Sequence, residues 1–152
     1  MAVCFFDTSA LVKYYHNELG RQMVVNLVDD PDNRIFISRL GLIEWHSAFF
    51  RLRRMDIFTQ DEFQTIRTRF LSDIRHRKFL IQPLERTNQN RAIRLLSRYA
   101  VTQSLRTLDA LQLAIALHTN SHTPLDHFVC ADIPFCQVAT LEGLSVLNPE
   151  SL

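Results

Sequence analysis

Residues 3–15 read VCFFDTSALVKYY, and this stretch decides the fold class. The run VCFF at residues 3–6 is wholly apolar and stops at Asp7, as expected of a strand buried on both faces. Helical spacing follows at once in residues 10–15. Because a buried strand that turns directly into a helix is the unit of parallel α/β sheets, the stretch predicts such a sheet, with Asp7 at the carboxyl end of a strand.

The same alternation of strand and helix continues to the end of the chain. Further strands are predicted at 34–38, 79–84, 127–132 and 144–147, and helices at 23–28, 40–55, 59–78, 88–100, 108–117 and 133–141. In the helix over 40–55 the pattern places Leu40, Ile43 and Phe50 on one side. Thr107 is predicted to cap the very apolar helix that follows it. The order predicts one domain over residues 1–152, a doubly wound α/β fold in three layers.

Composition excludes several classes of protein. The chain has 152 residues, of which 47% are hydrophobic and 22% charged, as in a globular domain with one core. Its three glycines lie far apart, so no P-loop, dinucleotide-binding turn or serine-esterase elbow can be written. No apolar stretch is long enough to cross a membrane and no signal peptide is recognisable, so a cytoplasmic location is expected. The three cysteines have no C-x-x-C spacing and are expected to be free thiols.

Charge is divided unevenly along the chain. Residues 51–106 hold 13 Lys/Arg and 5 Asp/Glu, whereas the two flanks together hold 4 and 11. This division suggests that the middle binds a polyanion while the flanks gather carboxylates. Four arginines are candidates for phosphate contact: Arg91, Arg94 and Arg98, which recur at helical spacing, and Arg106. A solvated helix face is the structural alternative for each of them.

Four carboxylates stand where a buried sheet would not place them. Asp7 and Asp132 end the strands at 3–6 and 127–132, Glu44 lies beside the apolar stripe of its helix, and Asp109 opens the most apolar helix. Ends of parallel strands and starts of the following helices meet at one crevice. Carboxylates gathered there would repel one another unless a cation lay among them, and ligation by oxygen alone favours Mg²⁺ or Mn²⁺.

Each of these residues also has a structural interpretation. Asp7 and Asp132 are in positions to cap the helices that follow them, and Asp109 is favoured by a helix dipole. Glu44 has no capping role, because it lies inside a helix. The placement of all four toward one crevice therefore favours a functional site.

Five motifs occur in order over nearly the whole chain: FFDTSALVKYY, IEW, SLRTLDALQLAIAL, FVCAD and GLSVLNP. Together they resemble the PIN-domain ribonucleases, in particular the VapC-type toxins of type II toxin-antitoxin systems. The resemblance implies a five-stranded parallel sheet between helices and an acidic site for Mg²⁺ or Mn²⁺. It places Asp7, Glu44, Asp109 and Asp132 on the four acidic positions of the family. Cys130 departs from the Ser or Thr that many relatives carry.

The implied activity is hydrolysis of RNA phosphodiester bonds by a metal-activated water. Asp7 and Asp109 would ligate the cation, with Glu44 and Asp132 completing its shell, holding a second ion or positioning water. The family also implies a cognate antitoxin partner and a homodimer. Tyr14 or Tyr15 is a candidate for stacking on an RNA base.

Two other hypotheses remain open. One is a catalytically silent PIN-fold module that binds RNA or protein, against which the presence of all four carboxylates argues. The other is a phosphatase with an Asp7 nucleophile, a chemistry that usually has a second acid where this chain has Ser9.

Overall fold

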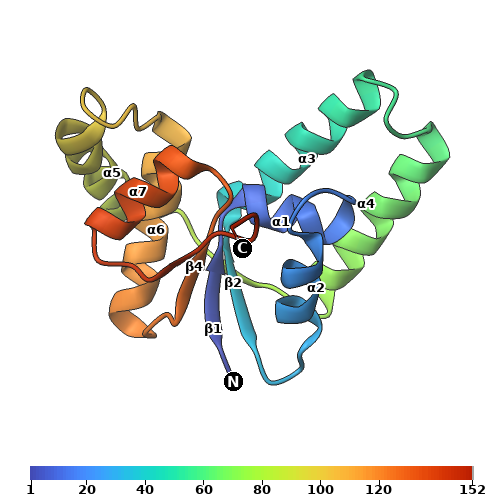
Figure 1. Ribbon diagram of the computed structural model, residues 1–152, viewed down its shortest axis with the longest axis horizontal. Coiled ribbons are helices and arrows are strands. Elements are labelled where there is room, and N and C mark those ends of the chain that lie inside the picture. The colour runs from blue at the N-terminus through green and yellow to red at the C-terminus, as the bar shows by residue number, and fades with distance from the viewer. Residues whose placement is uncertain (152) are drawn as a thin grey trace.

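A computed structural model describes residues 1–151 and contains five strands and seven helices (Figure 1). In chain order they are β1 (Val3–Phe6), α1 (Thr8–Tyr15), α2 (Arg21–Asp29), β2 (Arg34–Ser38), α3 (Arg39–Arg54), α4 (Gln60–Arg75), β3 (Leu80–Gln82), α5 (Arg86–Tyr99), α6 (Thr107–His122), β4 (His127–Val129), α7 (Ile133–Leu141) and β5 (Val146–Leu147). The sheet order is β3-β2-β1-β4-β5, and all neighbouring strands are parallel. The predicted α/β fold with a five-stranded parallel sheet is confirmed. None of the helices within residues 1–151 is long and apolar enough to cross a membrane.

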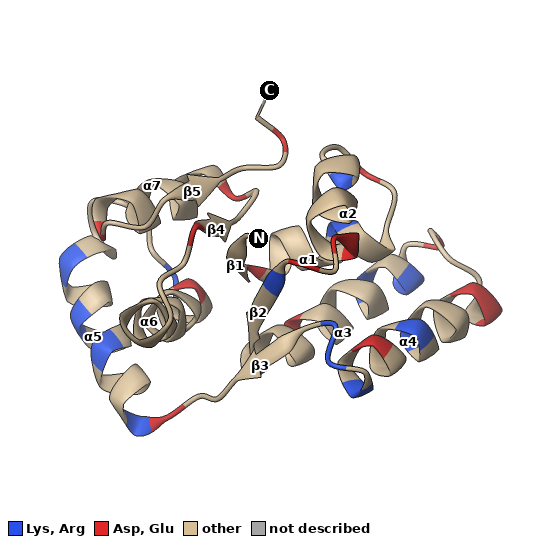
Figure 2. Ribbon diagram, turned by 90° about the horizontal axis from the view of Figure 1, so that it is seen from below, with Lys and Arg blue, Asp and Glu red and all other residues tan. Residues whose placement is uncertain are grey.

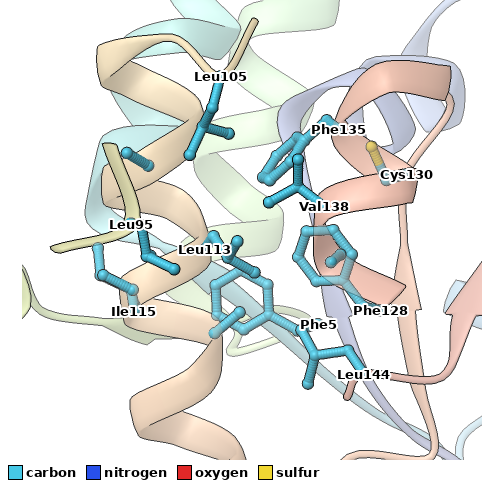
Figure 3. Packing of buried hydrophobic residues seen from close by; sticks show 14 of the residues in the cluster. Phe5, Leu95, Leu105, Leu113, Ile115, Phe128, Cys130, Phe135, Val138 and Leu144 are labelled. Carbon is cyan, nitrogen blue, oxygen red and sulfur yellow. The ribbon is translucent and has the colours of Figure 1, made fainter. Parts of the chain in front are cut away.

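Helices cover both faces of the sheet. Successive side chains of a strand point to opposite faces, so a wholly apolar strand needs a helical layer on each side. Helices α1 to α4 lie on one side and α5 to α7 on the other (Figure 1). Phe5 and Phe128 point into the cluster formed with α5, α6 and α7, where they stack with ring centroids 6.0 Å apart (Figure 3). Cys4 and Phe6 belong to the second cluster, formed with α1 to α4. The central strand β1 is therefore buried on both faces, as its apolar run predicts.

Helix α3 buries a different side from the predicted one. Ile43 and Phe50 are 66% and 44% exposed, whereas Trp45 and Phe49 are fully buried and stack 4.1 Å apart. The helix carries two apolar stripes, and spacing alone does not tell which of them meets the sheet. The partner helix α4 begins as predicted, with a capping box between Thr59 and Glu62.

Some predicted boundaries also differ from the structure. Helix α6 is capped by Arg106 without a side-chain hydrogen bond, so Thr107 is its first residue and not its cap. The helix also continues to His122, five residues beyond the predicted end. The strands at both edges of the sheet are shorter than predicted, since β3 and β5 have only three and two residues.

The proposed role of Tyr14 or Tyr15 in base stacking is wrong. Their exposed fractions are 1% and 7%, and both rings pack in the core between α1 and α4. Their hydroxyls donate to Asp29 and Asp73. Aromatic residues at helical spacing serve the core here, so neither ring is accessible to a base.

Candidate acidic site

The four candidate carboxylates lie where strands β1 and β4 end and helices α3 and α6 begin. Asp7 follows β1, and its backbone N–H donates to the carbonyl of Val129 at the end of β4 (3.0 Å). Asp132 lies three residues beyond Val129 and caps α7. Glu44 is in the second turn of α3 and Asp109 in the first turn of α6. Parallel pairing of β1 with β4 thus brings segments 125 residues apart in sequence to one edge of the sheet.

Asp7 is held firmly by its neighbours. Its Oδ2 accepts hydrogen bonds from the backbone N–H of Ser9 (3.2 Å) and from the Ser9 hydroxyl (2.7 Å). The Cys130 thiol is 3.6 Å from the same oxygen. The Ser9 hydroxyl in turn accepts from the N–H of Ala131 (3.0 Å), which ties the loop after β4 to α1. The Cys130 thiol thus contacts the Asp7 carboxylate.

Gln112, in the middle of α6, holds Glu44. Its amide nitrogen donates to Glu44 Oε1 (2.8 Å) and to the Thr8 hydroxyl (3.0 Å). Its amide oxygen accepts from the hydroxyl of Ser38 (2.6 Å), the N-cap of α3. Gln112 is 1% exposed, so this network is buried. It joins α6 to α1, β2 and α3 and fixes the direction of the Glu44 carboxylate.

Arg106 bridges the other two carboxylates. Its Nε is 3.3 Å from Asp109 Oδ2, and its Nη2 is 3.4 Å from Asp132 Oδ2. The second oxygen of Asp132, Oδ1, accepts from the N–H of Phe135 (3.1 Å). The Arg106 side chain is 74% exposed, so this cation lies over the outer side of the site.

The carboxylates act on one another electrostatically. Burial raises the pKa of Asp7 above its ordinary value, and the charge of Asp109 raises it further, while hydrogen bonds from Ser9 act against this. Burial also raises the pKa of Glu44, to which the charges of Asp7 and Asp109 add. The pKa of Asp109 is raised by burial and by Asp132, although Arg106 opposes this. The charge of Asp109 thus raises the pKa of Asp7 and of Glu44, and the charge of Asp132 raises that of Asp109.

A hard divalent cation fits this donor set by its chemistry. All four side chains offer carboxylate oxygen, which Mg²⁺ and Mn²⁺ prefer, and a cation would relieve their repulsion. In the arrangement over residues 1–151, however, no three His, Cys, Asp or Glu side chains are close enough together to hold an ion. Glu44 is hydrogen-bonded to Gln112, and Arg106 links Asp109 to Asp132. Ion binding therefore requires these side chains to turn from their present partners.

The family model of the PIN domain matches residues 4–139. The chain belongs to the PIN-domain family. The matched segment includes the four carboxylates, and the resemblance read from the sequence motifs is confirmed at the level of the family.

Solved structures share the fold of this PIN domain at low sequence identity. VapBC2 from Rickettsia felis, bound to a DNA fragment from its promoter, has a TM-score of 0.65 at 15% identity, covering 96% of this chain and 98% of that one. FitAcB from Neisseria gonorrhoeae has a TM-score of 0.66 at 16% identity, covering 98% and 99%. VapC20 from Mycobacterium tuberculosis, described as a sarcin-ricin loop cleaving toxin, has 0.63 at 15%, covering 93% and 95%. Comparison with curated protein sequences gives no match.

The three arginines of α5 lie away from the four candidate carboxylates of the PIN domain. Arg91, Arg94 and Arg98 line a cavity of about 380 Å³ together with Glu142, with which Arg98 forms an ion pair (2.8 Å). Figure 2 shows these basic positions along α5. None of the four candidate carboxylates lines that cavity. Of the four predicted phosphate-binding arginines, Arg106 is the one placed at the acidic site.

Gln112 is the site residue that sequence reasoning missed. It lies in the apolar run LDALQLAIAL. Glutamine is a good helix former, so its presence in a helix does not by itself indicate a buried contact. A signal was nevertheless present, because a polar side chain within a buried helix needs hydrogen-bond partners. Those partners, Ser38, Thr8 and Glu44, come from three other segments and are visible only in the folded structure.

Proposed function

We propose that this PIN domain is an endoribonuclease that depends on Mg²⁺ or Mn²⁺ and hydrolyses RNA phosphodiester bonds. The observation that carries the proposal is the placement of four carboxylates where β1 and β4 end and α3 and α6 begin, in a chain that the PIN-domain model matches. A cation would offset the repulsion among carboxylates placed in this way.

In the proposed mechanism Asp7 and Asp109 would hold the cation, and Glu44 and Asp132 would complete its shell, hold a second ion or position water. A bound cation would lower the pKa of the attacking water and offset negative charge on the phosphoryl oxygens. The Gln112 amide holds one Glu44 oxygen, so Glu44 would exchange this hydrogen bond when it takes part in the site. Direct attack by water would leave 5′-phosphate and 3′-hydroxyl ends.

We further propose that the domain, folded as one unit over residues 1–152, is the cytoplasmic toxin of a toxin-antitoxin pair. Two structures that share its fold support this role: one is a toxin-antitoxin complex from Klebsiella pneumoniae, with a TM-score of 0.57 at 19% identity, and the other is VapC20, a sarcin-ricin loop cleaving toxin. A cognate antitoxin would be its inhibitor, and a homodimer its assembly. Exposed apolar residues on α3, including Ile43 and Phe50, are available for either contact.

The test is cleavage of mixed RNA by purified protein freed of any partner, with Mn²⁺ or Mg²⁺ and with EDTA. Asp7→Asn is the site variant, and Asp61→Asn, at an exposed position in the first turn of α4, is the matched control. We expect cleavage by the wild type and by Asp61→Asn, and at least a hundredfold loss in Asp7→Asn and in EDTA, on the scale of losing a main catalytic group. Cleavage that ignores EDTA would contradict metal dependence. Absence of cleavage by well-folded protein would favour the silent binding module.

A further inference from the structure

A cavity of about 550 Å³ opens beside the acidic site, between the loop that precedes α6 and the start of α7. Asp109 and Asp132 are among its lining residues, so the cavity adjoins the acidic site. Its other lining residues are Gln103, Ser104, Leu105, Arg106, Ala131, Ile133, Pro134 and Phe135. The volume is within the range of small-ligand sites, about 300–1,000 Å³.

The cavity combines an apolar wall with polar groups at its edge. Leu105 and Phe135 are buried beneath it and belong to the core cluster of α5, α6 and α7 (Figure 3). Ile133 is 63% exposed, which is unusual for a large apolar side chain at a concave site. An apolar wall of this kind suits the flat face of a nucleobase, which binding sites hold between aromatic or apolar side chains.

The loop from Gln103 to Arg106 is built to present its side chains. Ser104 has a φ of 56°, in the left-handed region that residues other than glycine rarely adopt. The N–H of Gln103 donates to the carbonyl of Tyr99 (2.8 Å), which anchors the loop to α5. Strained backbone that is held in place in this way is common at ligand sites. The Gln103 amide offers one donor and one acceptor group at the cavity, as reading the edge of a base requires.

Arg106 supplies the charge that such a ligand needs. Its contacts with Asp109 and Asp132, at 3.3 and 3.4 Å, are longer than the 2.7–2.9 Å typical of strong charged hydrogen bonds. Because the side chain is largely exposed, its guanidinium can turn to a phosphate without unfolding the loop. Turning would also release the two carboxylates toward a cation.

We propose that this cavity is a nucleotide subsite, in which the base of the nucleotide next to the scissile phosphate lies against Ile133 and Pro134. Arg106 leaves Asp132 to hold the phosphate of that nucleotide, and Gln103 contacts the edge of the base. The inference rests on the proposed ribonuclease function for its substrate class. It adds a determinant of base preference that the four carboxylates do not supply.

The experiment is a titration of isotope-labelled, metal-free protein with each of the four nucleoside 5′-monophosphates, followed by amide NMR shifts. Ribose 5-phosphate, which lacks a base, is the comparison ligand. We expect at least one nucleotide to shift the amides of residues 103–106 and 131–135, and to bind about tenfold or more tightly than ribose 5-phosphate, since a stacked base contributes on that scale.

Ile133→Trp fills the cavity, and Ile93→Trp is its matched control on α5, because both isoleucines are 63% exposed. Ile133→Trp should weaken nucleotide binding about tenfold, and Ile93→Trp should leave it unchanged. Gln103→Ala, which leaves the apolar wall intact, should reduce the difference among the four bases. Equal binding of ribose 5-phosphate and nucleotides, unchanged binding by Ile133→Trp, or no shift at these residues would overturn the proposal. Because this assay needs neither metal nor cleavage, failure of the ribonuclease function would appear separately, as loss of cleavage with nucleotide binding retained.

Discussion

Asp7 and Asp132 each serve two purposes through a single carboxylate. Asp132 caps α7 with Oδ1 and meets Arg106 with Oδ2. Asp7 caps α1 with Oδ2, and its Oδ1 accepts no hydrogen bond from any of residues 1–151. A carboxylate has about four acceptor positions, so capping leaves capacity for a ligand. Helix capping and ligand binding by these residues are therefore compatible. The sequence alone does not show this, because it does not show which oxygens the caps use.

The first prediction concerns the cost of an ionised Asp109. Because its pKa is raised in the folded protein, the ionised form destabilises the fold at pH values above that pKa. The cost decreases as pH falls through the folded pKa toward the ordinary carboxyl pKa of 3.8 and is absent below that value. Asp109→Asn should therefore raise the Tm of metal-free protein at pH 7–8 by about 2–4 °C, or about 1 kcal/mol for a chain of this size. Scanning calorimetry between pH 4 and pH 8 measures it.

Asp61→Asn is the control for this prediction. Asp61 also stands in the first turn of a helix, α4, so both variants lose the same interaction with a helix dipole. Asp61 is exposed, and its variant should have no gain in Tm at pH 7–8. A lower Tm for Asp109→Asn throughout the pH range would mean that the Arg106 ion pair outweighs burial and repulsion.

At the scale of elements, α6 organises the site because it carries both Asp109 and Gln112. The first faces Arg106 and Asp132, and the second reaches Thr8 of α1, Ser38 of β2 and Glu44 of α3. A single helix thus connects both helical layers across the carboxyl edge of the sheet.

The second prediction is the effect of Gln112→Leu. The variant removes three buried hydrogen bonds and leaves Ser38 and Thr8 without a partner at this position, so we expect a loss of about 2–3 kcal/mol in the free energy of unfolding. Urea denaturation measures the loss. Gln64→Leu, at an exposed position of α4, is the control and should change stability by less than about 0.5 kcal/mol. A loss in Gln112→Leu no larger than in the control would show that the network contributes little.

The sequence predicts the elements best where a local signal is strong. The run VCFF and the Thr59–Glu62 capping box fixed β1 and the start of α4. The sequence pattern does not predict features that depend on packing. Helix α3 has two apolar stripes, and the stripe of Trp45 is buried because it packs against Phe70 and the sheet. The Gln112 network was missed for the same reason, since its three partners come from separate elements.

At the scale of the whole molecule, the candidate carboxylates and the arginines of α5 lie apart. The carboxylates follow β1 and β4 or lie near the starts of α3 and α6, while α5 carries Arg91, Arg94 and Arg98 (Figure 2). The uneven distribution of charge along the chain predicts this separation. The nearness of Arg106 to Asp109 in the sequence indicates one of its contacts, whereas the contact with Asp132 depends on the course of the loop before α6.

The third prediction tests whether RNA crosses α5. In an Asp7→Asn background, which keeps RNA uncut, the double change Arg91→Ala and Arg94→Ala should weaken binding of single-stranded RNA. It should also make the slope of log K against log salt shallower by about 1.4, as expected for two lost phosphate contacts. Fluorescence anisotropy with a labelled RNA measures both.

Arg75→Ala with Arg77→Ala is the control pair, since both residues precede β3 at the opposite, amino edge of the sheet. The control pair should leave the salt slope unchanged. Equal slopes for the wild type and the α5 variant would place the RNA path elsewhere.

The most direct measurement is isothermal titration of Mn²⁺ into metal-free protein, comparing wild type with Asp7→Asn, Asp109→Asn and the Asp61→Asn control. We predict saturable binding by the wild type and the control, with affinity at least tenfold lower in each site variant, because each loses an anionic ligand among coupled carboxylates. Equal Mn²⁺ affinity in all four proteins, with the fold intact, would contradict a metal site at these carboxylates.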